Sequence, residues 1–172
     1  MALTYEPIAT QTADGTSAYI TFNSVPQTYT DLILICQARS GTSGTYTDIY
    51  MRLATGGGAI DSGTNYSTTR LYGNGSSVTS DKITSSSLIY GVPIPATSAT
   101  AGNLATCIFQ IENYTNSSIN KTIICKGGDA GGYAAANVGL WRNTGAITSV
   151  QLLTNSNFTS GNTFTLYGIK AA

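Results

Sequence analysis

Apolar and polar residues alternate with a period of two along several segments of the chain. In 48-DIYMRL-53, for example, Ile49, Met51 and Leu53 alternate with an aspartate, a tyrosine and an arginine. Because successive side chains of a β-strand point to opposite faces, this pattern predicts strands with one buried face. The residues expected to point inward in the clearest segments are Ala18, Ile20, Phe22, Ile49, Met51, Leu53, Ala105, Cys107, Phe109, Ile111, Ala136, Val138, Leu140, Phe164 and Leu166.

The segment 31-DLILICQA-38 differs because it is apolar on both faces, which is typical of a central strand covered on both sides. Its Leu32 and Leu34 are assigned to the same core. Gly168 interrupts the alternation of the last segment, and we expect a bulge or a close backbone approach there. Further strand candidates are residues 5–9, 68–72, 88–92, 121–125, 147–153 and 163–170.

Helix signals are nearly absent, because good helix formers are scarce and no window keeps apolar residues at helical spacing. The short strands, separated by Gly, Ser, Asn and Thr, predict an all-β protein: an antiparallel two-sheet β-sandwich of jelly-roll type with about 8–11 strands. We expect residues 1–172 to form one domain, with residues 1–11 as a candidate N-terminal arm. The long connections 54–68 and 73–87 are either binding or mobile segments, or ordinary surface loops.

Charged residues make up only 9% of the chain, with eight basic and eight acidic side chains, whereas about 25% is usual. Threonine (27), serine (18) and glycine (19) fill the gap, so hydroxyl groups rather than charges cover the surface. Such a surface lacks the electric field that attracts nucleic acid or an anionic membrane. It is typical of any β-rich protein, and it also suits a protein that packs among copies of itself.

The expected compartment bears on the three cysteines. No apolar run approaches the roughly 18 residues that span a bilayer, and the N-terminus lacks the features of a secretory signal, so we expect folding in the cytosol. If 113-NYTNSSI-119 is a hairpin loop that is symmetric about Asn116, Cys107 faces Cys125 across neighbouring strands. An odd cysteine count and a cytosolic origin nevertheless predict that Cys36, Cys107 and Cys125 are buried thiols.

The chain shows no constellation of catalytic residues. It has no histidine, and its only glutamates are Glu6 and Glu112, so no Ser-His or Cys-His nucleophile arrangement can form. No calcium or phosphate motif occurs, and 127-GGDAGGY-133 is predicted to be a hairpin turn. We therefore expect no catalytic, cofactor-binding or metal-binding residues, and no cofactor. The isolated aspartates that could still form a carboxylate pair are Asp14, Asp31, Asp48, Asp61, Asp81 and Asp129.

Aromatic residues are the remaining candidates for binding. Eleven tyrosines and one tryptophan are present, and rings on outer faces or loops could stack on sugars or make subunit contacts. Without a fixed spacing between the rings, subunit contacts are favoured over sugars. The aromatic residues expected on outer faces or loops are Tyr50, Tyr72, Tyr114, Tyr133 and Trp141.

Two terminal stretches resemble a known group of proteins. The stretches are 28-TYTDLILICQARS-40 and 161-GNTFTLYGIKAA-172. They resemble small virion proteins of tailed bacteriophages of marine and cyanobacterial hosts, which carry a TYTDL strand that ends in ARS and close on FTLYGIKAA. The resemblance covers both ends of the chain, and the middle only in character. Its motifs are structural strands, so no active site is carried over.

The resemblance implies a non-enzymatic part of a virion. The first interpretation is a capsid decoration (cement) protein, a homotrimer that binds the phage major capsid protein on the capsid surface after assembly in the host cytoplasm. The second is a tail-fibre or tail-spike tip that binds host glycans. A free lectin, or a glycosidase with unrecognised carboxylates, lies outside the resemblance. The start at Met1 and the lack of a shaft-forming repeat favour a standalone protein, and hence decoration. We expect neither nucleic acid nor membrane as a partner.

Overall fold

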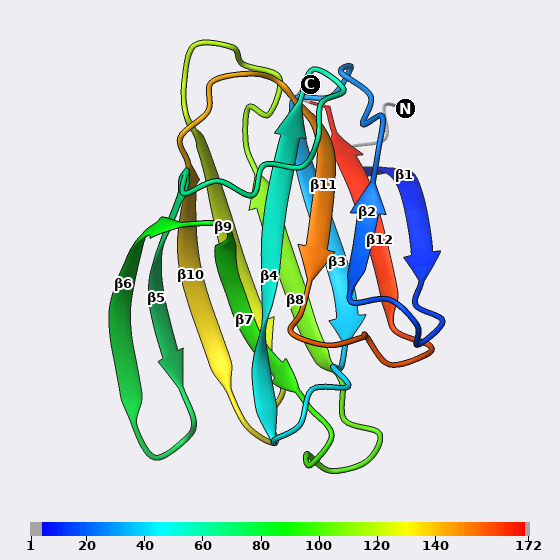
Figure 1. The fold of residues 1–172 in the computed structure, drawn as a ribbon, viewed down its shortest axis with the longest axis vertical. Coiled ribbons are helices and arrows are strands. Elements are labelled where there is room, and N and C mark those ends of the chain that lie inside the picture. The colour runs from blue at the N-terminus through cyan, green and yellow to red at the C-terminus, as the bar shows by residue number, and fades with distance from the viewer. Residues whose placement is uncertain (1–4, 171–172) are drawn as a thin grey trace.

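The computed structural model describes residues 5–170, which form β-strands and no helix (Figure 1). The strands pair antiparallel in two sheets, which confirms the predicted all-β sandwich. There is one strand more than predicted, because β6 lies in the segment 73–87, which was expected to be a long connection. The twelve strands are β1 (Tyr5–Thr12), β2 (Tyr19–Phe22), β3 (Asp31–Ala38), β4 (Tyr46–Thr55), β5 (Tyr66–Gly73), β6 (Val78–Ser86), β7 (Ile89–Pro95), β8 (Ala105–Ile111), β9 (Lys121–Gly128), β10 (Ala134–Trp141), β11 (Ile147–Leu153) and β12 (Thr163–Ile169).

The two sheets differ in size. The larger has eight strands in the order β1-β12-β3-β8-β9-β10-β5-β6, and the smaller has four in the order β2-β11-β4-β7. Figure 1 shows the smaller sheet in front of the larger one, with β5 and β6 projecting beyond it at the left. Strand β7 is the edge of the smaller sheet and packs over β8, β9, β10 and β5. The hairpin of β5 and β6 therefore extends past the second layer.

Early strands pair with late strands in reverse order. Strand β1 pairs with β12, β2 with β11, β3 with β8, and β4 with β7. This is the pairing of one long antiparallel hairpin that is folded into two layers. The other four strands extend the larger sheet beyond β8. Residues 5–11 of the candidate N-terminal arm lie in β1 at the edge of the larger sheet, and residues 1–4 lie outside the described residues.

The last strand lies inside the larger sheet, between β1 and β3. Gly168 continues the pairing with β3 without a register shift, but a Cβ atom there would lie 2.3 Å from the ring of Tyr29. The close approach expected at Gly168 is therefore made by a side chain. The register shift lies instead in β1, between Pro7 and Ala9.

The core between the sheets contains most of the residues that the alternation assigns to it. The predicted core residues that are buried are Ile20, Phe22, Leu32, Leu34, Ile49, Met51, Phe109, Phe164 and Leu166. The prediction for β10 is wrong by one residue. Val138 is 50% exposed and Leu140 only partly buried, and the inward positions are Asn137, Gly139 and Trp141.

The close approach of the two sheets explains the inward face of β10. A Cβ atom on Gly139 would lie 2.5 Å from Ile89 of β7, and one on Gly91 of β7 would lie 2.7 Å from the Ile49 carbonyl oxygen. Asn137 Nδ2 donates a hydrogen bond to the Gly91 carbonyl. Positions that face β7 must therefore be small or must satisfy its backbone, so Val138 and Leu140 of β10 point outward.

Strand β3 is central in its sheet, as predicted, but the second sheet covers only one of its faces. Leu32, Leu34 and Cys36 point into the core. On the other face exposure rises from the buried Ile33 to the exposed Gln37. The apolar character of this outer face comes from packing against neighbouring strands rather than against a third layer.

The connection between β4 and β5, residues 56–65, is held in place by Asp61. Trp141 Nε1 donates to Asp61 Oδ2 at 2.7 Å, and Asn65 Nδ2 donates to the same oxygen at 2.9 Å. The backbone N–H of Asp61 donates to the Leu53 carbonyl at 2.9 Å. This connection is therefore a surface loop that is anchored to a buried tryptophan, rather than a loose one.

Candidate functional site

Most acidic side chains bind nearby groups of the fold. Asp14 accepts from the Thr16 amide at 2.8 Å, and Asp31 accepts from the Asn113 amide at 2.7 Å. Among residues 5–170 there is no group of three or more Cys, Asp or Glu side chains that could hold a metal ion. One pair of carboxylates is nevertheless brought together by an arginine.

This arginine is Arg70 of β5, which brings together two carboxylates that are distant in the sequence. Its Nε and Nη2 atoms donate to the two oxygens of Asp81 in β6 at 2.7 and 2.5 Å. Its Nη1 atom donates to Asp48 Oδ2 in β4 at 3.0 Å. Arg70 and Asp81 are direct cross-strand partners, whereas Asp48 comes from the other sheet. Sequence spacing carries no signal for a contact between sheets, so the sequence did not predict this cluster.

The three charged groups shift one another's pKa. The hydrogen bond from Arg70 lowers the pKa of Asp81, and the same bond raises the pKa of the Arg70 guanidinium. Burial raises the pKa of Asp48, although the attraction of Arg70 opposes that effect. With both carboxylates ionised, one cation faces two anions. Arg70 therefore pairs with both carboxylates, and the three groups together keep an excess of negative charge.

Tyrosine rings surround this cluster. The Tyr46 and Tyr133 centroids lie 5.1 Å apart in an edge-to-face arrangement, and those of Tyr72 and Tyr133 lie 6.2 Å apart. The Arg70 guanidinium carbon lies 5.1 Å from the Tyr72 centroid and 5.0 Å from that of Tyr90. Tyr72 and Tyr133, two of the residues predicted to lie on outer faces or loops, are thus brought together at a half-exposed site.

Two of the other aromatic candidates are misplaced by the sequence prediction. Tyr114 is fully buried and Trp141 is 1% exposed, so neither can stack on a ligand. Trp141 lies parallel to its cross-strand partner Tyr66, with ring centroids 5.9 Å apart. The Tyr66 hydroxyl accepts from the Leu53 amide at 3.1 Å. Trp141 points inward because the inward set of β10 is displaced by one residue from the predicted set.

The three cysteines are buried free thiols, as predicted. The predicted pairing of Cys107 with Cys125 is wrong: Cys107 faces Cys36 of β3, and Cys125 faces Phe109. The hairpin of β8 and β9 is therefore not symmetric about Asn116. Burial raises the pKa of the Cys36 and Cys125 thiols, so they stay protonated and act as small apolar side chains.

The most extensive candidate for binding is the side of the larger sheet that points away from the smaller sheet, over β8, β9, β10, β5 and β6. Exposed apolar residues gather there: Val78 is 75% exposed, Leu71 and Val138 are 50% exposed, and Ile124 is 38% exposed. Lys82 and Lys126 are the charged side chains in the set that defines this surface. The outer face, as we call it, consists of Ser67, Thr69, Leu71, Val78, Ser80, Lys82, Thr106, Ile108, Gln110, Thr122, Ile124, Lys126, Ala134, Ala136, Val138 and Leu140.

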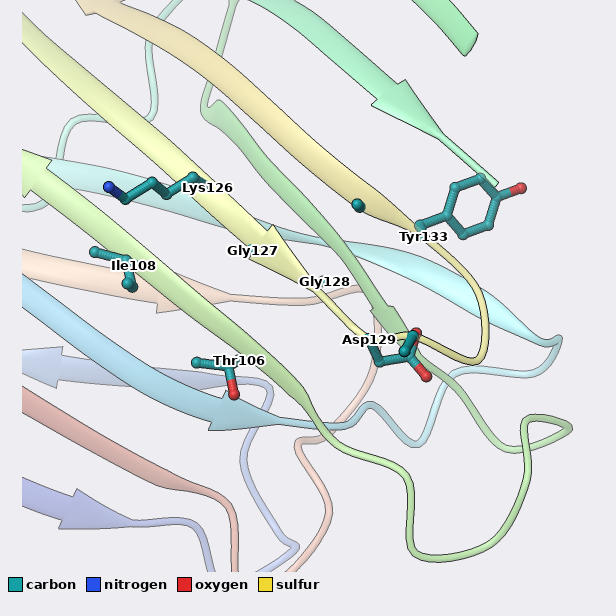
Figure 2. A pocket seen from close by; sticks show the side chains of 9 residues that line it. Thr106, Ile108, Lys126, Gly127, Gly128, Asp129 and Tyr133 are labelled. Carbon is teal, nitrogen blue, oxygen red and sulfur yellow. The ribbon is translucent and has the colours of Figure 1, made fainter. Parts of the chain in front are cut away.

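A shallow hollow of about 500 Å³ lies at one end of the outer face (Figure 2). Figure 2 shows Thr106 and Ile108 of β8 on one side, Lys126 of β9 beside them, and Tyr133 at the far end. Gly127 and Gly128 form its floor with positive φ angles of 147° and 134°. A Cβ atom on Gly127 would lie 2.0 Å from the Thr106 carbonyl oxygen, so the floor requires glycine.

The glycines also confirm the predicted hairpin. Segment 127–133 connects β9 and β10, which pair antiparallel with Ala134 opposite Gly128. A neighbouring hollow of about 480 Å³ on the same face is lined by Leu71, Val78 and the alanines of β10. The outer face is therefore an uneven and largely apolar surface with two depressions, and its charged side chains are Lys82 and Lys126.

Comparison with other proteins does not place this chain in a family. None of its residues 5–170 belongs to a helix long and apolar enough to cross a membrane. No protein-family model and no curated protein matches the chain.

Proposed function

We propose that this chain is a non-enzymatic virion structural protein, a capsid decoration protein that binds the phage major capsid protein and stabilises the shell. The observation that carries the proposal is the outer face. Four of its apolar side chains, Leu71, Val78, Ile124 and Val138, are exposed, and its charged side chains are two lysines, Lys82 and Lys126. Contiguous apolar surface of this kind marks a site of protein interaction.

The low charge of the outer face favours burial against another protein. Removing charged groups from water is costly, whereas removing apolar groups is favourable by about 25 cal/mol per Å². A stable contact should bury more than about 1,000 Å² in total. A broad sheet face offers such an area without a change in backbone conformation.

The two stretches that resemble phage virion proteins form one structural unit. Strand β3 and strand β12 are neighbours and pair over their full length, from Asp31 opposite Ile169 to Gln37 opposite Thr163. Tyr29 of the first stretch packs on Gly168 of the second. The resemblance therefore concerns a single pair of strands, which supports a common fold rather than two chance matches.

The strand order supports the jelly-roll interpretation. In the set β1–β4, β7, β8, β11 and β12, each early strand pairs with a late one in reverse order. We regard the fold as a jelly roll, with β5–β6 and β9–β10 as two inserted pairs of strands. Both insertions extend the larger sheet and supply much of the outer face.

We propose that the decoration protein is a homotrimer. Capsid lattices offer positions of local three-fold symmetry, and closed symmetry lets one docking patch be used three times. The outer face of each subunit would contact the capsid protein, which leaves other surfaces for contacts between subunits.

Localisation tests the proposal. Antibodies against this chain, conjugated to gold, are applied to intact virions, and the particles are imaged by electron microscopy. We expect label over the capsid. Label confined to the tail would reject decoration and favour the alternative, a tail tip that binds host glycans.

A matched pair of variants tests the docking surface. Val138→Lys places a charge in the centre of the outer face and should abolish binding to emptied, undecorated capsids. Tyr19→Lys places the same charge on β2 of the other sheet, where the side chain is 57% exposed, and should bind normally. Equal binding by both variants would show that the outer face is not the docking surface.

A further inference from the structure

A hollow of about 260 Å³ opens beside the Arg70 cluster, and it shares Tyr72 and Tyr133 with the hollows of the outer face. Strands of both sheets and the β9–β10 connection contribute to it. It is lined by Tyr46, Asp48, Arg70, Tyr72, Pro93 and Tyr133. Its volume is below the range of about 300–1,000 Å³ that is usual for drug-sized ligands, so it suits a single ring.

The aromatic wall is held in a defined geometry. Tyr133 packs edge-to-face on Tyr46 and is tilted against Tyr72. Gly132 lies so close to the Tyr46 ring that a Cβ atom at this position would be 1.9 Å from it. The Tyr46 hydroxyl is directed to Asp129 Oδ2, 3.4 Å away. These contacts fix the rings before any ligand arrives, which reduces the entropy lost on binding.

The polar side of the hollow is equally fixed. Arg70 is clamped by both oxygens of Asp81, and it holds Asp48 through Oδ2 alone. Within residues 5–170, Asp48 Oδ1 and the hydroxyls of Tyr72 and Tyr133 make no hydrogen bond. The hollow thus offers one carboxylate oxygen and two hydroxyls to a ligand.

Arg70 disfavours two classes of ligand. A cation at Tyr72 would lie beside the Arg70 guanidinium, whose carbon is already 5.1 Å from the ring centroid. An anion meets an arginine whose charge is already matched by Asp48 and Asp81. A purely apolar ligand would strip water from these charged groups without replacing their hydrogen bonds.

We propose that this hollow binds a neutral saccharide, with one pyranose ring against the tyrosine wall. A pyranose has an apolar face of C–H groups that can pack on a tyrosine ring, and hydroxyl groups at its edge. Those hydroxyls would donate to Asp48 Oδ1 and exchange hydrogen bonds with Tyr72 and Tyr133. The inference does not depend on the decoration function: Tyr72 and Tyr133 also line the hollows of the outer face, but Asp48 belongs to the smaller sheet and lines none of those hollows.

Saturation-transfer NMR on the full chain tests the inference. The probes are the methyl pyranosides of glucose, galactose, mannose and N-acetylglucosamine, with tetramethylammonium and methyl phosphate as charged comparisons. We expect saturation transfer to at least one pyranoside and to neither ion, with a dissociation constant on the order of 1 mM. Transfer to no pyranoside at up to about ten times that concentration, or to an ion instead, would overturn the proposal.

Variants assign the binding to this hollow. Asp48→Asn preserves the shape and removes the carboxylate charge, and Tyr72→Ala removes part of the wall. Each should weaken pyranoside binding by at least about tenfold, as expected for the loss of a charged hydrogen bond or a packed ring. Tyr72→Phe keeps the ring, so its pyranoside affinity should fall less. The comparison shows whether the weaker binding of Tyr72→Ala comes from the missing ring or from a folding defect.

Tyr19→Ala is the matched control, because Tyr19 is an exposed tyrosine on β2 that does not line the hollow. It should bind pyranosides as the unmodified chain does. Equal loss in Tyr19→Ala, or full binding in both Asp48→Asn and Tyr72→Ala, would refute the assignment. Capsid binding should persist in Asp48→Asn, because Asp48 lies in β4 of the smaller sheet, so failure here is distinguishable from failure of the docking proposal.

Discussion

Phe164 and Val138 both lie in alternating apolar segments, yet Phe164 is fully buried and Val138 is half-exposed. Phe164 packs edge-to-face on Phe158 with centroids 4.9 Å apart. We expect Phe164→Ala to lower the free energy of unfolding by about 3–5 kcal/mol, because it leaves a cavity. Val138→Ala should change it by less than about 1 kcal/mol. Urea denaturation of both variants measures the difference, and similar losses would contradict the assigned faces.

The carboxylate of Asp61 should make stability sensitive to acid. Burial opposes ionisation of Asp61, but hydrogen bonds from Trp141, Asn65 and Gly63 outweigh it and lower the pKa below its ordinary value near 3.8. A lowered pKa stabilises the fold above the unfolded value, and this contribution is lost as pH falls through the folded value.

The corresponding test compares Asp61→Asn with the unmodified chain. At pH 6 the variant should be less stable by about 1–2 kcal/mol, since a charged acceptor for the Trp141 indole is lost. At pH 3 and below the difference should shrink. Urea denaturation at both pH values checks this, with Glu112→Gln as an exposed control. A difference that does not change with pH would argue against an ionised Asp61.

The cysteine thiols offer a further residue-scale test. Cys36, Cys107 and Cys125 are all buried, and burial raises the pKa of two of them. Thiol titration in denaturant without reductant should count three, and in the native protein the reaction should be slow because access requires unfolding. A count of one would show that a disulfide joins two of the cysteines.

At the scale of elements, the contact between β10 and β7 ties the two sheets together. Asn137 accepts a hydrogen bond from the Leu71 amide at 3.2 Å and donates to the Gly91 carbonyl of β7. Thr68 Oγ1 accepts from the Tyr90 amide at 3.0 Å. Side chains of the larger sheet thus satisfy backbone groups at the edge of the smaller one, and this edge is closed to pairing with another chain.

Asn137→Ala should destabilise the fold by about 1–3 kcal/mol, because it leaves a buried carbonyl of β7 without its donor. Ala136→Ser, one residue earlier on the outer face, is the control and should change stability by no more than about 0.5 kcal/mol. Hydrogen exchange should show the added opening at β7 amides first. Unchanged β7 protection in Asn137→Ala would mean that the strand is held by packing alone.

At the scale of the whole molecule, the proposed trimer can be measured directly. Sedimentation or mass photometry of the purified chain should give three times the chain mass of 17.9 kDa. Val138→Lys should keep that mass while losing capsid binding, because the outer face is assigned to the capsid rather than to subunit contacts. A monomer at micromolar concentration would contradict the trimer, and a monomeric Val138→Lys variant would reassign the outer face to self-association.

The strand-forming character of the chain follows from its local pattern. Period-two alternation and scattered turn residues depend only on neighbours in the sequence, so they predict the all-β sandwich, the burial of Phe164, and the inward set of β4. The position of β12 inside a sheet also agrees with its apolar alternation. These features need no knowledge of which strands meet.

The reversed face of β10, the buried Trp141 and the Arg70 cluster could not be predicted in the same way. Each depends on a contact between sheets: Gly139 and Asn137 face β7 because the layers come close there, and Asp48 reaches Arg70 across the two sheets. Segment 73–87 reads as a loop because β6 extends beyond the second layer and has little to bury. The alternation of a segment shows which of its side chains are apolar. The distance between the two sheets decides which face of the strand has room for them.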